Sequence, residues 1–85
     1  MKVVLVSEDN HGLIAVAADR TAAIDFLIAS GWIYGGCELW IPEKREGFCI
    51  QDLFPDWQDW LRHSATDEDF ENMGYGIEEK EVYEI

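Results

Sequence analysis

The sequence predicts an α+β fold, a small and mostly antiparallel sheet with two to three helices, in the order ββα ββ αα β. This follows from two pairs of short β-rich runs joined by turn residues, and from helical patterns of apolar residues after each pair. The chain has 85 residues, 48% of them hydrophobic, with four Trp, three Tyr and four Phe. This length and composition predict a single folded domain over residues 1–85 rather than a disordered acidic chain.

The first hairpin is predicted from residues 3–7 and 13–17, which are short β-rich runs. The loop between them contains Asn10 and Gly12, two residue types that adopt the positive φ angles of hairpin loops. We therefore expect these two strands to pair antiparallel.

A helix is expected after this hairpin. Asp19 or Thr21 can cap its N-terminus, and Gly31 is placed to end it just after Ser30. Ala23, Ile24, Leu27 and Ile28 recur on one face of this helix. The predicted core is Ile24, Leu27, Ile28, Trp32, Leu39 and Ile41.

Residues 37–41 and 47–50 predict a second hairpin, whose turn at residues 42–46 holds two of the six basic residues. Cys37 and Cys49 lie in these apolar runs. A cytosolic pair of cysteines is usually reduced, so we expect two buried free thiols rather than a bridge. Their spacing from the two His residues matches no zinc module, so we expect no metal and no cofactor.

The second half of the chain predicts two helices and a final strand. Proline lacks the N–H that the first helical turn leaves unpaired, so Pro55 is expected to begin a helix that runs to about His63. Thr66 and Asp69 have the spacing of a capping box at the start of a short helix. The expected apolar anchors of these helices are Trp57, Trp60, Leu61, Phe70 and Met73. Residues 77–85 predict a terminal strand, based on Val82, Tyr83 and Ile85.

Charge is the most uneven feature of the sequence. The chain has 18 acidic and six basic residues, which gives a formal net charge of −12. Residues 52–85 carry eleven acids and two bases, whereas residues 1–51 carry seven acids and four bases. Self-repulsion of this kind destabilises a compact domain, so the charge serves either solubility or the recognition of a basic partner. It also opposes direct binding to nucleic acid, whose phosphates attract Lys and Arg.

Enzymatic chemistry is not indicated. Ser7, Asp9 and His11 are residue types of a hydrolase triad, but they lie in one loop, whereas triad residues converge from separate elements. The acids at residues 67–71 do not keep the register of an EF-hand loop. We therefore expect a binding surface made by the acids of the second half. The candidate partner-binding residues are Asp52, Asp56, Asp59, Asp67, Glu68, Asp69, Glu71, Glu78 and Glu79.

Two segments carry a resemblance to known proteins. Residues 6–17 (Val-Ser-Glu-Asp-Asn-His-Gly-Leu-Ile-Ala-Val-Ala), followed by residues 22–28 and Trp32, resemble the N-terminal half of small acidic proteins from phages and mobile elements of Gram-positive bacteria. In size, acidity and α+β order the chain is similar in kind to anti-CRISPR inhibitors that imitate DNA. The resemblance implies an inhibitor that occupies the DNA-recognition cleft of an RNA-guided nuclease. It transfers no individual residue role.

Together these features predict a non-enzymatic acidic binding protein, a phage-type inhibitor that mimics nucleic acid. Its expected partner is a basic nucleic-acid-binding protein, such as the RNA-guided nuclease of a type II CRISPR system. The alternative is a small acidic adaptor, a homodimer or an accessory subunit, with Trp57, Trp60 or Tyr75 as its aromatic anchors. The apolar run at residues 3–6 is too short for a signal peptide or a membrane span, so we expect a cytoplasmic protein, in the host cell if a phage encodes it.

Overall fold

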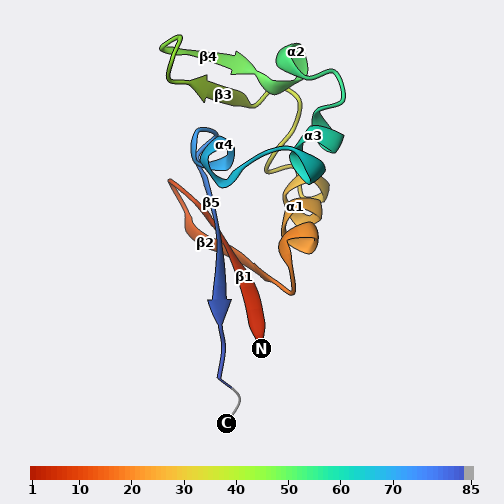
Figure 1. Ribbon diagram of the computed structural model, residues 1–85, viewed down its shortest axis with the longest axis vertical. Coiled ribbons are helices and arrows are strands. Elements are labelled where there is room, and N and C mark those ends of the chain that lie inside the picture. Colours follow the sequence, from red (N-terminus) through yellow and green to blue (C-terminus); the bar gives the residue numbers. More distant parts are fainter. Residues whose placement is uncertain (84–85) are drawn as a thin grey trace.

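The computed structural model describes residues 1–83 and has an α+β fold (Figure 1). The elements are β1 (Lys2–Glu8), β2 (Gly12–Ala17), α1 (Arg20–Ala29), β3 (Glu38–Ile41), β4 (Glu46–Cys49), α2 (Ile50–Leu53), α3 (Trp57–His63), α4 (Asp67–Glu71) and β5 (Tyr75–Glu81). The predicted order is confirmed, with one additional short helix, α2. The molecule is elongated, with extents of 47 × 22 × 20 Å.

The larger sheet has three antiparallel strands in the order β2-β1-β5. The central strand β1 lies opposite β2 on one side and β5 on the other, so that Val4 pairs with both Ala17 and Glu79. Because side chains alternate along a strand, Val4 and Val6 point to the face that α1 covers, and both are buried. The first hairpin is therefore confirmed as predicted.

Helix α1 begins where the sequence allows two caps, and the structure uses Asp19. Its carboxylate accepts a hydrogen bond from the Ala22 N–H at 2.8 Å. Ala23, Ile24 and Leu27 are buried against the sheet. The whole core of the described residues is Val4, Val6, Ala23, Ile24, Leu27, Ile33, Leu39, Ile50, Leu61, Phe70 and Tyr75.

Three predicted core residues, Ile28, Trp32 and Ile41, are only half-buried and pack against the edge of this core. A domain of this size encloses few positions completely, because its surface is large relative to its volume. Ile24, Leu27 and Leu39 are buried as predicted.

Strands β3 and β4 form a separate two-stranded sheet rather than extending the first one. A hydrogen bond of 3.0 Å from the Trp40 N–H to the Asn72 carbonyl joins this hairpin to the end of α4. The predicted second strand is one residue too long at its end. Ile50 is fully buried and begins α2, in which its carbonyl accepts from the Phe54 N–H at 2.8 Å.

Two other predicted elements have wrong boundaries. Pro55 lies in the turn before α3, and the helix begins at Trp57 after Asp56. The terminal strand begins at Tyr75 rather than residue 77, because Tyr75 already pairs with Glu8 of β1. It ends at Glu81, so Val82 and Tyr83 lie outside it and are exposed, and Ile85 lies outside the described residues.

Both cysteines are free thiols and half-buried. Cys49 lies opposite Glu38 in the β3–β4 register, so the two sulfurs are not paired across the hairpin. No helix within residues 1–83 has the length and apolar character needed to cross a membrane.

Candidate acidic interface

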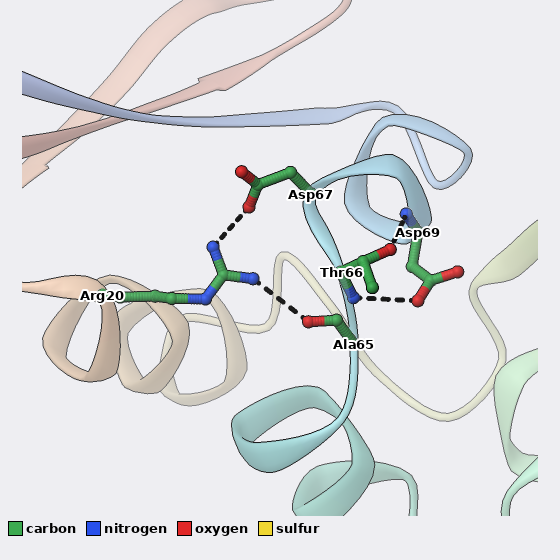
Figure 2. Close-up of polar contacts among 5 residues, drawn as sticks. All are labelled: Arg20, Ala65, Thr66, Asp67 and Asp69. Carbon is green, nitrogen blue, oxygen red and sulfur yellow. Dashed lines mark hydrogen bonds and ion pairs between the residues drawn. The ribbon is translucent and has the colours of Figure 1, made fainter.

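Helix α4 is short, and its first turn is fixed by a capping box. The Thr66 hydroxyl accepts a hydrogen bond from the Asp69 N–H at 3.2 Å, and the Asp69 carboxylate accepts from the Thr66 N–H at 2.9 Å (Figure 2). Two N–H groups that a helix start leaves unpaired are thereby satisfied. Asp69 is half-buried in this role, so it is a structural acid more than an exposed one.

Arg20 at the start of α1 holds α4 from the other side. One guanidinium nitrogen, Nη1, lies 2.5 Å from the Asp67 carboxylate, and Nη2 donates to the Ala65 carbonyl at 3.1 Å (Figure 2). The same guanidinium lies 5.4 Å from the ring centroid of buried Phe70, within the range of a cation–π contact. A single side chain thus ties the turn before α4, the first residue of α4 and its core anchor to α1.

Helix α4 packs beside β5, as Figure 1 shows for the blue end of the chain. Asp67, Glu71 and Glu78 line a hollow of about 380 Å³ whose apolar part includes Leu5 and Leu13. A second hollow of about 330 Å³ shares Asp67, Ile77 and Glu78, and adds Val4, Arg20 and Glu79. We call Asp67, Glu71, Glu78 and Glu79 the α4–β5 acidic surface.

This surface wraps around the edge of the sheet. Glu78 lies opposite Leu5 and Glu79 opposite Val4, so the two carboxylates project to opposite faces. The Asp67 side chain remains 67% exposed despite its ion pair with Arg20, and Glu71, Glu78 and Glu79 are also exposed. Lys80 is the basic residue of β5, and α4 contains none. The other basic residue at this surface is Arg20, whose contacts with Ala65, Asp67 and Phe70 we call the Arg20 clamp. The net charge of the surface is therefore negative.

The structure does not bring all nine predicted residues together. Glu68 is exposed on α4 beside the surface defined above. Asp52, Asp56 and Asp59 belong to α2, the turn after it and α3, which lie to the right of β5 in Figure 1. Asp56 and Asp59 line a separate hollow of about 380 Å³ next to Trp60. The acids of the second half thus form two groups on different sides of the molecule.

The loop that resembled a hydrolase triad has another arrangement. His11 Nδ1 lies 2.6 Å from the Glu8 carboxylate, and the His11 ring meets Trp32 edge-on with centroids 5.2 Å apart. The hydrogen bond with His11, followed by the one from the Asn10 N–H, lowers the pKa of Glu8 below its ordinary value. This pairing stabilises the hairpin loop, and no hydrogen bond links His11 to Ser7 within the described residues.

The three aromatic residues that were expected to be anchors are buried or half-buried in the structure. Tyr75 is only 7% exposed, and its hydroxyl donates to the Trp32 carbonyl at 2.8 Å. Burial, with smaller contributions from the negative charges of Cys37, Glu8 and Tyr34, raises the pKa of Tyr75 to about 12. Trp57 and Trp60 are half-buried against the core, and Trp60 stacks on Phe54 with centroids 4.1 Å apart. The main role of these three rings is to pack in or against the hydrophobic core.

Sequence reasoning missed two features. The Arg20 clamp joins residues 47 positions apart, and no local pattern marks such a pair. The second is a hollow of about 460 Å³ that is bordered by Tyr34, Glu38 and Trp40. Its only signal in the sequence is the strand alternation that places Glu38 and Trp40 on one face of the second hairpin.

Comparisons of the chain with protein-family models, with curated proteins and with solved structures give no match. Within residues 1–83, no group of three or more His, Cys, Asp or Glu side chains is arranged to hold a metal ion. The resemblance to phage proteins therefore stays a prediction.

Proposed function

We propose that this protein is a non-enzymatic, phage-type inhibitor that mimics nucleic acid and occupies the basic cleft of a nucleic-acid-binding protein. The observation that carries the proposal is the α4–β5 acidic surface, in which acids from a helix and a strand border two adjoining hollows. The candidate partner is a host nuclease, such as the RNA-guided nuclease of a type II CRISPR system.

Rigidity supports this proposal. A charge on a disordered tail must lose conformational entropy on binding, whereas these carboxylates stand on elements that are already ordered. The capping box fixes the first turn of α4, and the Arg20 clamp ties α4 to α1. The surface is therefore preorganised for a partner that carries Arg and Lys in fixed positions.

The spacing of charges on β5 also supports it. An antiparallel strand rises about 3.4 Å per residue, and one strand of duplex DNA carries a phosphate about every 3.4 Å along its axis. Strand β5 carries Glu78, Glu79 and Glu81 within four residues, interrupted by Lys80. Glu78 projects to the opposite face from Glu79 and Glu81, so carboxylates that share a face of β5 lie about 6.8 Å apart along the strand, which equals two phosphate steps along the DNA axis. A formal net charge of −12 steers the approach.

The expected anchors of the alternative, a small acidic adaptor or dimer, are less exposed than such an interface requires. Tyr75 is buried, and Trp57 and Trp60 pack against the core. The exposed aromatic residues are Tyr34, Trp40 and Tyr83 among those that the structure describes. An adaptor function would have to use these rings, and salt would affect such an apolar interface much less than an ionic one.

A pull-down from a bacterial lysate, followed by mass spectrometry, identifies the partner, and variants of equal charge then test the surface. Glu71→Gln with Glu78→Gln removes two carboxylates that have no ion pair in residues 1–83, and leaves Asp67 and Asp69 in their structural roles. We expect a loss of about 1 to 3 kcal/mol of binding free energy for each partly desolvated pair.

The matched control is Glu43→Gln with Glu46→Gln in the second hairpin, which changes the net charge equally and should cost about 0 to 1 kcal/mol for each exposed acid. A third variant, Asp56→Asn with Asp59→Asn, reports whether the second acidic group takes part. Equal affinities of the α4–β5 variant and the hairpin control would refute the proposed surface.

A further inference from the structure

The hollow under the second hairpin has the composition of a site for a cation. Tyr34 and Trp40, which are 58% and 46% exposed, border it together with the Glu38 carboxylate, and Asn72 and Met73 line it from the end of α4. It measures about 460 Å³. Large aromatic side chains of this kind are normally buried, and two of them at one hollow mark a place where a ligand can stack.

Two glycines leave room for the Tyr34 ring and the Glu38 side chain to lie against the backbone. A Cβ on Gly36 would lie 2.9 Å from Cε2 of the Tyr34 ring, which is closer than side chains tolerate. A Cβ on Gly47 would lie 3.3 Å from both Cδ and Oε2 of Glu38. Gly47 is also the residue directly opposite Trp40 in the hairpin. Glu38 and Trp40 therefore share one face of the hairpin, on which Cys49 lies opposite Glu38 and no side chain lies opposite Trp40.

The charges at this hollow select the ligand class. Glu38 forms no ion pair within residues 1–83, and the nearby cation Lys44 lies over the Phe48 ring instead, 5.4 Å from its centroid. An aromatic face and a free carboxylate both attract a cation. A phosphate-bearing ligand would be repelled by Glu38 and by the net charge, and an apolar ligand would bury the carboxylate without a partner.

We propose that this hollow binds an arginine side chain of the protein's partner, with the guanidinium stacked on Trp40 or Tyr34 and paired with Glu38. Arginine fits better than lysine because its planar, weakly hydrated guanidinium both stacks on rings and binds carboxylates. The inference rests on the proposed function in one respect, that the partner is basic. It adds a second contact point, distinct from the α4–β5 acidic surface.

The test uses the isolated full chain and the peptide Ac-Gly-Arg-Gly-NH₂, followed by ¹H–¹⁵N NMR. We expect saturable shifts of the Trp40 indole and the Gly47 amide, with a dissociation constant on the order of 1 to 10 mM, as for a few weak contacts. The same peptide with citrulline, which keeps the shape and lacks the charge, should bind at least about fivefold more weakly. A lysine peptide is expected to lie between them.

Three variants locate the site. Glu38→Gln and Trp40→Ala should each weaken arginine binding by about two- to fivefold or more, and Trp40→Phe should restore part of it. Glu43→Gln, on the turn of the same hairpin, should leave it unchanged. Any one of three results would overturn the inference. These are equal shifts with the arginine and citrulline peptides, shifts that Trp40→Ala does not alter, and the absence of a shift with every peptide.

This outcome is separable from that of the proposed function. Arginine binding at Trp40 with no effect of Glu71→Gln and Glu78→Gln on the partner would uphold the hollow and reject the acidic surface. The reverse pattern would reject the hollow alone.

Discussion

At the scale of single residues, Arg20 determines where the acidic helix lies. It contacts the Asp67 carboxylate, the Ala65 carbonyl and the Phe70 ring, although its nearest partner is 45 positions away in the sequence. The acids themselves are visible in the sequence, but their roles are only partly so. Of the four acids at residues 67–71, Asp69 was recognised from its capping-box spacing, whereas the pairing of Asp67 with Arg20 is a long-range contact that no local pattern separates from Glu68 and Glu71.

Tyr75 provides a residue-scale prediction from its burial. Its pKa of about 12 lies above the ordinary value of 10.0, so the folded state holds the phenol proton more tightly than the unfolded state does. The stabilisation from neutral Tyr75 is complete below pH 10.0 and is lost as the pH rises through about 12. In an alkaline titration of tyrosinate absorbance, one of the three tyrosines should ionise about two pH units late.

The Tyr75→Phe variant is the control for this titration. The late step should be absent from it, and its stability should fall less than that of the wild type between pH 10 and pH 12. Ionisation of all three tyrosines in one step near pH 10, with the chain still folded, would show that Tyr75 is not buried as described.

At the scale of elements, local signals succeeded where the stabilising contact is local. The Asp19 cap of α1, the capping box at Thr66 and the first hairpin all depend on residues a few positions apart, and all are confirmed. Pro55 and the end of β4 were misplaced because the deciding contacts are tertiary. Ile50 is buried in the core and begins α2, and Pro55 lies in the turn that follows this helix.

The acidic group was predicted only in part for the same reason. The charge and pattern of the sequence identified nine candidate acids of the second half for a binding surface. Most of them are exposed in the structure. Their division into an α4–β5 group and an α2–α3 group depends on how the chain folds back beside β1. A count of charges along the sequence contains no information on that division.

The capping box gives an element-scale prediction. Thr66→Ala removes the oxygen that accepts from the Asp69 N–H, so the free energy of unfolding should fall by about 1 kcal/mol. Thr21→Ala is the matched control, because Thr21 is exposed in the first turn of α1 and α1 is capped by Asp19. Its effect should stay within about 0.5 kcal/mol in urea unfolding. Equal losses in the two variants would mean that the capping box does not stabilise α4.

At the scale of the whole molecule, the elongated shape spreads contact points along one axis. The three-stranded sheet lies at one end, the β3–β4 hairpin lies at the other, and α4 lies between them (Figure 1). The long extent of 47 Å corresponds to about 14 base-pair steps at ~3.4 Å each. A duplex cleft that spans this length can therefore contact both the acidic surface and the hollow at Trp40.

Mimicry requires that this protein and nucleic acid exclude one another from the same cleft. The direct measurement is a titration of this protein into a complex of its captured partner with labelled nucleic acid, at low and at high salt. We expect complete displacement at low salt, with an apparent affinity that falls steeply as salt rises, because both ligands bind through the same cations. Simultaneous binding of protein and nucleic acid with unchanged affinities would contradict mimicry and favour an adaptor.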